Sequence, residues 1–294
     1  MGPYLVRELE QEGHPVTCYN RRGVHPRDGD SIKGDREDGN ALRTAILDLN
    51  PDLVIEMIPY REEQAIALGR ILNESKSRLI ACSSVDIYQA YNILHRLEDP
   101  PYQTCPIKES DALRSTLGAD GKEYDKLNVE RQYLSLDVDV TIFRLPAIYG
   151  WPDKRRVKPY VDQIEKTGVV KMHPDEAKWR CSRALNENCA YAISLGLDQC
   201  GKSVYNVGEL YSYTEAEWCR KIGEVLGWDG EIEIDPTLGC GGDAKQHWVV
   251  DNQLIREKLG YFEKYDCDEG LRRSVAKYLE SEQMTSANPA ELDG

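Results

Sequence analysis

The sequence predicts an α/β fold with a doubly wound parallel sheet and a smaller α/β lobe at its C-terminal end. Over the first 150 residues, segments of helical periodicity alternate with short, almost entirely apolar segments. This alternation is typical of crossover units whose helices cover both faces of a parallel sheet. Beyond about residue 150 the apolar segments become sparse. We therefore expect domains at 1–150 and 151–282, followed by a disordered polar tail at 283–294.

The expected elements follow from the positions of the apolar residues. The first is a helix over 4–13, with Leu5, Val6 and Leu9 on one face and Gly13 as its stop. A Thr-x-x-Glu pattern beginning at Thr214 predicts a capping box for a helix over 214–226. The other expected elements are strands at 15–20, 52–58, 78–83, 140–144 and 203–207, and helices at 39–49, 61–73, 122–135, 186–197 and 268–280.

Charge and hydropathy exclude several classes of protein. The 294 residues include 37 basic and 51 acidic side chains, a formal net charge of −14. This balance argues against binding to nucleic acid or to an anionic membrane surface, which both require surplus Lys and Arg. No apolar run approaches the ~20 residues of a membrane span, and the start Met1-Gly2-Pro3-Tyr4 does not resemble a secretory signal. We expect a cytoplasmic protein.

The cysteines and histidines give no sign of a disulfide framework or a metal site. The nine cysteines are scattered from Cys18 to Cys267 without a CxxC pair. This pattern predicts reduced thiols. The histidines share no ligand spacing, so we expect no metal. They stand at positions 14, 25, 95, 173 and 247.

The start of the chain departs from the usual order of a doubly wound, nucleotide-binding sheet. Such a sheet begins with a central strand and a glycine-rich turn, which leads into a helix whose N-terminus receives the pyrophosphate. Here the chain opens on Met1-Gly2, where the last glycine of that turn is expected. A sheet without its middle strand leaves two neighbours unpaired. We therefore expect Met1 to be an internal methionine of a longer gene product; the alternative is a fold that never had the strand.

Several ordered pieces of sequence carry a resemblance to a known family. They are Asn20-Arg21-Arg22-Gly23, Gly34-Asp35-Arg36-Glu37-Asp38, Ser83-Ser84-Val85-Asp86-Ile87-Tyr88, Tyr124-Asp125-Lys126 with Glu130, Arg144-Leu145-Pro146-Ala147-Ile148-Tyr149-Gly150, the stretch 251–261, and Glu269-Gly270-Leu271-Arg272-Arg273. In this order the sequence resembles the extended short-chain dehydrogenase/reductase superfamily, and within it the NAD-dependent epimerase/dehydratase proteins. The resemblance covers nearly the whole chain. It implies a Rossmann-like NAD(P)-binding domain at 1–150 that lacks its first strand, and a substrate lobe at 151–282.

The resemblance also implies where a dinucleotide would bind. Arg21 and Arg22 follow the strand whose end faces the cofactor ribose, and an arginine fork there suits the 2′-phosphate of NADP, whereas an acidic residue would suit NAD. NADP is therefore slightly favoured over NAD, although two arginines in a surface turn can simply be solvated. Asp35 corresponds to an adenine-contacting aspartate. The remaining implied cofactor contacts are Gly2, Ile58, Ser83, Lys126 and Pro146.

The catalytic pattern implied by the family is only partly present. The family uses a Tyr-x-x-x-Lys pair, in which the lysine one helical turn away favours the phenolate. Here Lys122 stands four residues before Lys126, and Tyr124 only two residues before it. On one helix Tyr124 and Lys126 would point roughly 200° apart, so their cooperation requires the helix to begin at or after Tyr124. Three alternatives stay open: Tyr124 is the catalytic phenol, another tyrosine such as Tyr88 or Tyr91 replaces it, or the standard chemistry is lost.

Other residues are implied by the same resemblance. Ser84 stands at the place of the family's catalytic Ser/Thr, and its hydroxyl could donate to a substrate carbonyl. Asp86 could bind substrate or act as an elimination acid or base, although aspartates more often cap turns. Arg180 and Arg183 could grip an anionic substrate, because arginine forks fit phosphates; surface ion pairs are the alternative.

These residues together imply an NAD(P)-dependent oxidoreductase, epimerase or dehydratase acting on a nucleotide-sugar or related small carbonyl compound. The protein could form a homodimer. The alternatives are a catalytically inactive cofactor-binding or scaffold relative, and an RNA-binding relative, against which the charge of −14 argues.

Overall fold

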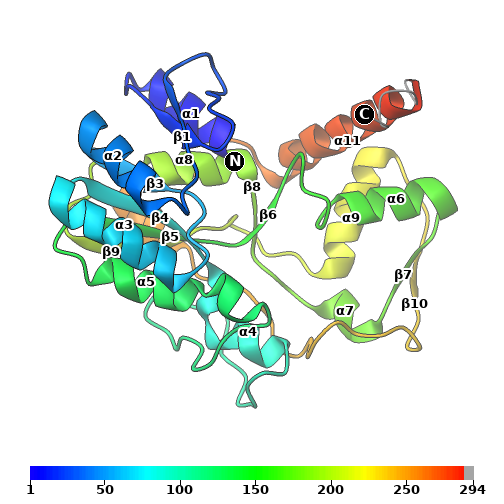
Figure 1. Cartoon of the computed structure of the whole chain (residues 1–294). Coiled ribbons are helices and arrows are strands. Elements are labelled where there is room, and N and C mark those ends of the chain that lie inside the picture. Colours follow the sequence, from blue (N-terminus) through cyan, green and yellow to red (C-terminus); the bar gives the residue numbers. More distant parts are fainter. Residues whose placement is uncertain (288–294) are drawn as a thin grey trace.

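Helices and strands alternate through the first half of the chain, as the apolar pattern predicts (Figure 1). The computed structural model describes residues 1–287. Local signals place the ends of the elements: Asp38, for example, accepts hydrogen bonds from the amides of Asn40 and Ala41 and so begins the second helix. The elements are α1 (Gly2–Gln11), β1 (Cys18–Asn20), β2 (Ser31–Lys33), α2 (Gly39–Leu49), β3 (Leu53–Glu56), α3 (Glu62–Ser75), β4 (Arg78–Ser84), α4 (Gln89–Leu94), α5 (Lys126–Leu134) and β5 (Val140–Leu145), with 3₁₀ turns η1 (Val85–Ile87) and η2 (Gly121–Tyr124).

The largest sheet is parallel and has helices on both faces, which confirms the predicted doubly wound architecture. Its strands lie in the order β3-β4-β5-β9, where β9 is Lys202–Asn206. Successive residues of β4 point to opposite faces. Ile80 and Cys82 pack in one apolar core with α1 and α8 (Asn186–Ser194), whereas Leu79 and Ala81 pack in another with α2, α3 and α5.

The strands β1 and β2 form a sheet of their own. They run parallel, with Cys18 opposite Ser31, and among the described residues neither is hydrogen-bonded to β3. The sequence did not lead us to expect β2. A side chain at Gly34, which follows β2, would collide with the ring of Tyr19, so a larger residue there would force that ring to move. The sheet is thus interrupted between β1 and β3.

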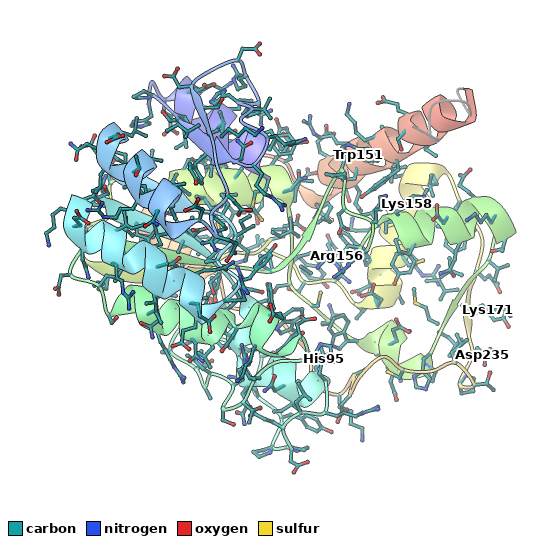
Figure 2. All side chains as sticks on the ribbon, viewed as in Figure 1. His95, Trp151, Arg156, Lys158, Lys171 and Asp235 are labelled. Atoms are coloured by element: carbon teal, nitrogen blue, oxygen red, sulfur yellow. The ribbon has the colours of Figure 1, made fainter. Side chains whose placement is uncertain are left out.

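The C-terminal lobe is built around the fully buried Trp218. The ring of Tyr149 meets it edge-on at 5.0 Å between centroids. Thr214 and Glu217 form the predicted capping box at the start of the helix that carries Trp218. Figure 2 shows Lys171 and Asp235 at the outer side of this lobe, where β7 (Val170–Met172) pairs with β10 (Ile232–Ile234). The elements after β5 are β6 (Ala147–Tyr149), α6 (Lys158–Thr167), β7 (Val170–Met172), α7 (Pro174–Lys178), β8 (Arg183–Leu185), α9 (Glu215–Leu226), β10 (Ile232–Ile234), α10 (Gln253–Leu259) and α11 (Cys267–Ala287).

The chain crosses between the lobes more often than a single boundary at residue 150 implies. The helix α8 packs on α1, and β9 pairs with β5, so both belong to the large lobe although they follow residue 150. At the C-terminal end, α11 continues to Ala287. Residues 283–287 of the expected disordered tail are therefore helical, and residues 288–294 lie outside the described part.

The described residues contain no disulfide, since all nine cysteines are free thiols. Within residues 1–287 no three His, Cys, Asp or Glu side chains gather closely enough to hold a metal ion. No helix in this part of the chain combines the length and the apolar character needed to span a membrane.

Candidate functional site

The candidate site lies where β4 ends. The buried strand leads through Ser83 and Ser84 into the 3₁₀ turn η1, and the Ser84 Oγ accepts a hydrogen bond from the Asp86 amide at 3.4 Å. The turn holds Asp86 in the interior, where it is 7% exposed. Because the carboxyl ends of parallel strands are where open α/β sheets bind ligands, this turn is well placed to carry chemistry.

The segment before α5 brings Tyr124 and Lys126 to the same place. Tyr124 ends the 3₁₀ turn η2, and α5 begins at Lys126 with Asp125 as its N-cap. The helix therefore begins after Tyr124, as cooperation between the two residues requires. A buried ion pair fixes the junction, because Arg114 Nη2 donates to Asp125 Oδ1 at 2.9 Å and the Asp125 amide donates to the Tyr60 carbonyl at 2.7 Å.

The Lys126 ammonium group points into the protein. Its Nζ donates to the Cys82 carbonyl at 3.2 Å and lies 5.0 Å from the ring centre of Tyr60 and 5.4 Å from that of Tyr124. Burial lowers the pKa of Lys126, and the negative groups nearby, Asp86 among them, oppose that shift. The amine is thus held beneath two aromatic rings, with two further donor hydrogens available when it is protonated.

The Tyr124 hydroxyl meets both residues of the β4 turn. It interacts with the side chains of Ser84 and Asp86, and its ring packs 5.3 Å from that of Tyr60. Burial raises the pKa of Tyr124, and the negative charge of Asp86 raises it further, while Ser84 acts in the opposite direction. In this arrangement Tyr124 is a neutral phenol, a proton donor.

Asp86 is the most strongly perturbed carboxyl of this site. Burial raises its pKa to about 6, although Ser84, Lys126 and Arg114 all favour the charged form. Its Oδ1 is buried and has no hydrogen-bond partner. A buried acceptor left open beside a phenol is available to a hydroxyl group of a bound molecule.

The alternative tyrosines are placed differently. Tyr88 is completely buried; its hydroxyl donates to Asn206 Oδ1 at 2.7 Å and accepts from Arg144 Nη1 at 2.8 Å. Tyr91 packs against His95 and Trp248, with ring centres 4.3 and 5.4 Å away. The Tyr88 hydroxyl is thus occupied by hydrogen bonds inside the protein. Among the three tyrosines, Tyr124 is the one beside both Ser84 and Lys126.

No role was expected from the sequence for Tyr60, Arg114 or Asp125, which the structure brings to the site. Tyr60 follows the end of β3, and its position after a parallel strand was an available signal. Arg114 lies in the long connection between α4 and α5, and its partnership with Asp125 depends on the path of that loop. Loop paths have no periodic signature, so neither partner could be recognised from spacing.

Most of the cofactor-binding residues expected from the resemblance stand at the carboxyl end of a parallel strand or just after it. Arg21 and Arg22 are exposed in the turn after β1, and the Arg22 amide donates to Asn20 Oδ1 at 3.1 Å. Asp35 is exposed after β2 and accepts from the Glu37 amide. The other expected residues stand at the start of α1 (Gly2), after β3 (Ile58), at the end of β4 (Ser83) and between β5 and β6 (Pro146).

The two arginines expected to bind substrate already have partners. Arg183 is buried; it is ion-paired with Glu215, and its guanidinium carbon lies 4.6 Å from the ring centre of Trp218. Arg180 donates to the Ser212 carbonyl at 2.7 Å and is 3.3 Å from a Glu217 oxygen. The structure does not bring either residue to the Ser84 site through any contact it records, and substrate binding by Arg183 would require release from Glu215.

Comparison with known proteins identifies the fold. No protein-family model and no curated protein matches this sequence. A UDP-glucose 4-epimerase from Thermotoga maritima, solved with UDP-glucose, is 16% identical, with a TM-score of 0.73 over 95% of this chain and 96% of the epimerase. A UDP-N-acetylglucosamine 4-epimerase from Bacillus cereus is 15% identical, with a TM-score of 0.75 over 94% of each chain. WbmG from Bordetella bronchiseptica, solved with NAD and UDP, is 15% identical, with a TM-score of 0.73 over 95% of this chain and 92% of WbmG. The chain therefore has the Rossmann-like fold of these solved structures.

Proposed function

We propose that the protein binds NAD or NADP along the carboxyl ends of the parallel strands and acts on a nucleotide-sugar or related small carbonyl compound. The observation that carries the proposal is the meeting of Ser84, Asp86, Tyr124 and Lys126 at the end of β4. Solved structures of the same fold include a UDP-glucose 4-epimerase with NAD from Thermus thermophilus. The ligand class rests on what these solved structures bind, and the chemistry rests on the residues of this chain.

The residues at the carboxyl end of β4 fit the ribose and nicotinamide end of such a cofactor. The fit rests on the buried Lys126 amine, which has donor hydrogens to spare, and on the partnerless Ser83 Oγ and Asp86 Oδ1. Gly2, Arg21, Arg22, Asp35, Ile58, Ser83, Lys126 and Pro146 are the residues we assign to cofactor contacts. A bound dinucleotide would supply hydride acceptance and donation at its nicotinamide ring.

The residues of the chain would supply orientation and proton transfer. Ser84 Oγ is positioned to donate a hydrogen bond to a substrate carbonyl, and the neutral Tyr124 hydroxyl is positioned to give a proton to the same oxygen. Burial is the largest influence that raises the pKa of Tyr124, and a substrate that displaces Asp86 from the hydroxyl would remove the second. Asp86 would then bind a substrate hydroxyl or act as the second acid or base.

The choice between the two dinucleotides turns on Arg21 and Arg22. Both side chains are exposed at the end of β1, where a guanidinium fork can meet a 2′-phosphate. We therefore propose a modest preference for NADP. Arg21→Ala and Arg22→Ala together should weaken the binding of NADPH more than that of NADH, which parallel fluorescence titrations measure.

One observation favours a second function, a cofactor-binding protein without catalysis. Lys126 faces the ring of Tyr124, and the net effect of the surroundings is to raise, not lower, the pKa of this phenol. A protein that uses this fold only to sense or hold a dinucleotide would need Lys126 and Ser83 but not an acidic Tyr124.

Titration and turnover together separate the two functions. Fluorescence titration with NADH and NADPH should detect binding, and UDP-glucose and related sugars should be converted in the presence of the cofactor. Tyr124→Phe should reduce kcat by roughly 10²- to 10⁴-fold without loss of dinucleotide binding, and Lys126→Met should weaken binding itself. Tyr102→Phe is the matched control, because Tyr102 is exposed and donates to Asp243. Binding without turnover over a broad panel of sugars supports the sensor, and absence of binding contradicts both.

The same proposal includes the cellular location and the oligomeric state of the protein. We place it in the cytoplasm, because nine reduced thiols are maintained in a reducing compartment. We also propose that the protein forms a homodimer. Measurement of its molar mass in solution by light scattering would distinguish a dimer from a monomer.

A further inference from the structure

Three aromatic side chains stand together beside the turn that holds Asp86. The ring centre of Tyr91, in α4, lies 4.3 Å from that of His95 and 5.4 Å from that of Trp248. The Trp248 Nε1 donates at 3.0 Å to the carbonyl of Val85, the residue before Asp86. We call Tyr91, His95 and Trp248 the aromatic wall. Figure 2 shows His95 on the side of the large lobe that faces the C-terminal lobe.

The aromatic wall has accessible rings and unused polar groups. Tyr91 and Trp248 are half-buried, and His95 is exposed. Within residues 1–287, neither the Tyr91 hydroxyl nor the His95 imidazole has a hydrogen-bond partner. Burial lowers the pKa of His95, and Asp120 opposes this shift, so the imidazole is neutral at pH 7 and offers one donor and one acceptor. The wall can therefore pack against a ring and form hydrogen bonds at the same time.

The Tyr91 hydroxyl lies within electrostatic reach of the candidate site. Burial raises the pKa of Tyr91 to about 12, and the negative charges of Asp86 and Asp120 contribute to this shift. Arg114, which is ion-paired with Asp125 at the start of α5, acts on Tyr91 in the opposite direction. Tyr91 is thus a neutral hydrogen-bond donor near the carboxyl group whose Oδ1 has no partner.

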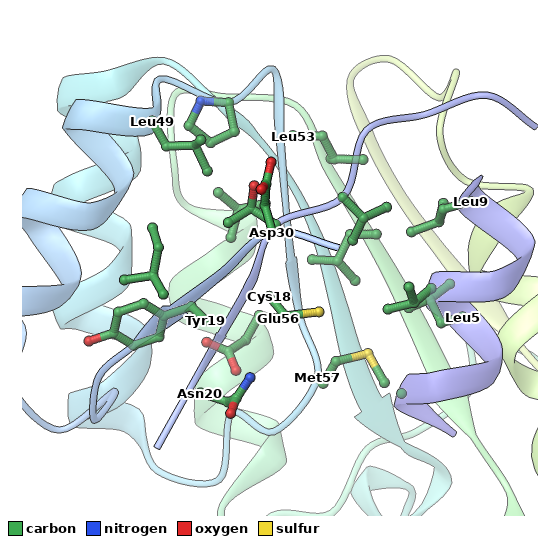
Figure 3. A pocket seen from close by; sticks show the side chains of 18 of the residues that line it. Leu5, Leu9, Cys18, Tyr19, Asn20, Asp30, Leu49, Leu53, Glu56 and Met57 are labelled. Atoms are coloured by element: carbon green, nitrogen blue, oxygen red, sulfur yellow. The ribbon is translucent and has the colours of Figure 1, made fainter. Parts of the chain in front are cut away.

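The composition of the wall matches a ring that carries hydroxyl groups. A pyranose has an apolar face of C–H groups, which the negative face of an aromatic ring attracts, and hydroxyl groups at its rim, which need partners when water is displaced. Leucines gather instead in the hollow between β1 and β3, where Figure 3 shows Leu5, Leu9 and Leu53. Leucine offers neither a π face nor a hydrogen bond, so these side chains do not favour such a ring. The aromatic wall offers both.

We propose, as an extension that rests on the proposed function, that the aromatic wall binds the sugar ring of the nucleotide-sugar and determines which sugars the protein accepts. Ser84 and Tyr124 hold the oxygen at the reacting carbon, and the open Asp86 Oδ1 accepts from a neighbouring hydroxyl group. The C–H face of the ring then packs on the wall. The nucleotide does not contact the wall, so these three side chains contribute to the binding of the sugar alone.

Trp248 belongs to a segment that joins the two lobes. Its amide donates to the Arg180 carbonyl at 2.9 Å, and its carbonyl accepts from the Ser182 amide at 2.9 Å. On the other side, the Val249 carbonyl accepts from the Ile107 amide of the large lobe at 2.8 Å. The position of Trp248 is therefore set by both lobes, and its fluorescence can report on the sugar subsite.

Paired titrations with UDP-glucose and UDP test the proposal, because the two ligands differ by the sugar. In the parent, UDP-glucose should bind more tightly than UDP. Tyr91→Leu should weaken the binding of UDP-glucose about tenfold and leave that of UDP unchanged. Tyr91→Phe keeps the ring and should lose about threefold. His95→Ala, at an exposed position, should also weaken UDP-glucose about threefold, and it carries the test if Tyr91→Leu does not fold.

Tryptophan fluorescence gives an independent readout. UDP-glucose should quench it more than UDP does, and Trp248→Phe should remove this difference. The matched control is Trp228→Phe, because Trp228 lies in the C-terminal lobe and donates to the Gly168 carbonyl at 2.8 Å. This control should keep the difference in quenching.

Two outcomes overturn the proposal. If Tyr91→Leu and His95→Ala bind both ligands as the parent does, the wall does not contact the sugar. If the two variants weaken UDP and UDP-glucose equally, the wall does not distinguish the sugar from the nucleotide. Failure of the proposed function looks different: a parent protein that binds NADH or NADPH but neither UDP nor UDP-glucose contradicts that function, and the sugar subsite with it.

Discussion

The two halves of the large lobe contain similar strands in different surroundings. Every residue of β5 is buried, whereas every residue of β1 and β3 is half-buried. The difference follows from pairing: β5 has a strand on each side, and β3 has β4 alone among the described residues. We call β4 and β5, which have a strand on each side, the paired half, and β1, β2 and β3 the open half. The candidate site is built on the paired half, which can hold charged side chains in fixed positions.

The largest effect should come from a buried ion pair in the paired half. Arg144 Nη2 lies 2.9 Å from Glu130 Oε2, and both side chains are almost fully buried. Glu130→Gln leaves the guanidinium without its carboxylate and should lower the free energy of unfolding by about 3–5 kcal/mol. Urea denaturation monitored by circular dichroism measures it.

The matched variant in the open half is Glu37→Gln, which breaks the exposed pair with Arg61. It should cost about 0–1 kcal/mol. Replacing both Glu130 and Arg144 by Met should recover part of the loss, because it removes both buried charges. A loss below about 1 kcal/mol for Glu130→Gln would mean that the paired half does not depend on this ion pair.

The next effect compares two isoleucines that lie opposite each other in adjacent strands. Ile55 of β3 is paired in register with Ile80 of β4, and Ile80 is 1% exposed while Ile55 is half-buried. Ile80→Ala should cost about 2–5 kcal/mol, and Ile55→Ala about half as much, because β3 has a strand on one side only and less contact is lost there. Equal losses in chemical denaturation would show that Ile55 is packed as closely as Ile80 in solution.

A smaller, pH-dependent effect belongs to Asp86. Its pKa rises from 3.8 to about 6 through burial, so the folded state holds the proton more tightly than the unfolded chain does. Stability should therefore fall as the pH rises from about 4 to about 6 and remain lower above that range, by about 3 kcal/mol in all. Asp86→Asn should remove this loss, so that the variant is more stable than the parent at pH 7 but not at pH 4.

A second buried carboxyl provides the control for that measurement. Burial raises the pKa of Glu209 to about 7, and the Tyr149 hydroxyl donates to its Oε1 at 2.7 Å. Glu209→Gln should remove a similar loss of stability, which in the parent develops as the pH rises from about 4.5 to about 7. If neither variant alters the dependence of Tm on pH, both carboxyls are hydrated in solution.

The sequence predicted the regular parts of the fold because those parts have periodic signals. The apolar segments at 78–83 and 140–144 became β4 and β5, and the Thr214 capping box is formed. The strand β2 was not foreseen, since Ser31-Ile32-Lys33 holds a single apolar residue and its pairing with β1 is decided by tertiary contacts. The tail was expected to be disordered from residue 283, yet α11 continues to Ala287, because polar composition alone does not end a helix.

The site was predictable only where a residue follows a strand or a motif. Ser84, Tyr124 and Lys126 were implied by the family resemblance of their motifs, and the start of α5 at Lys126 confirms the condition under which the last two can meet. The involvement of Arg114 was not visible, because it depends on a loop that folds back across the site. The partners of Arg183 were also invisible, since Glu215 is 32 residues away in sequence and reaches it only through the packing of the C-terminal lobe.

The smallest effect asks whether the open half unfolds together with the rest of the molecule. Thr214 caps α9 in the C-terminal lobe, and Asp38 caps α2 beside the open half, where its carboxylate accepts from the Asn40 and Ala41 amides at 3.1 and 3.0 Å. Thr214→Ala should cost about 1 kcal/mol, and Thr214→Ser should restore most of it. Asp38→Ala should cost about 0.5 kcal/mol or less in global unfolding, because a region with an unpaired strand edge can open before the global transition. Hydrogen exchange should instead show its effect locally, as faster exchange in α2, and equal global costs for the two caps would mean that both regions unfold as one cooperative unit.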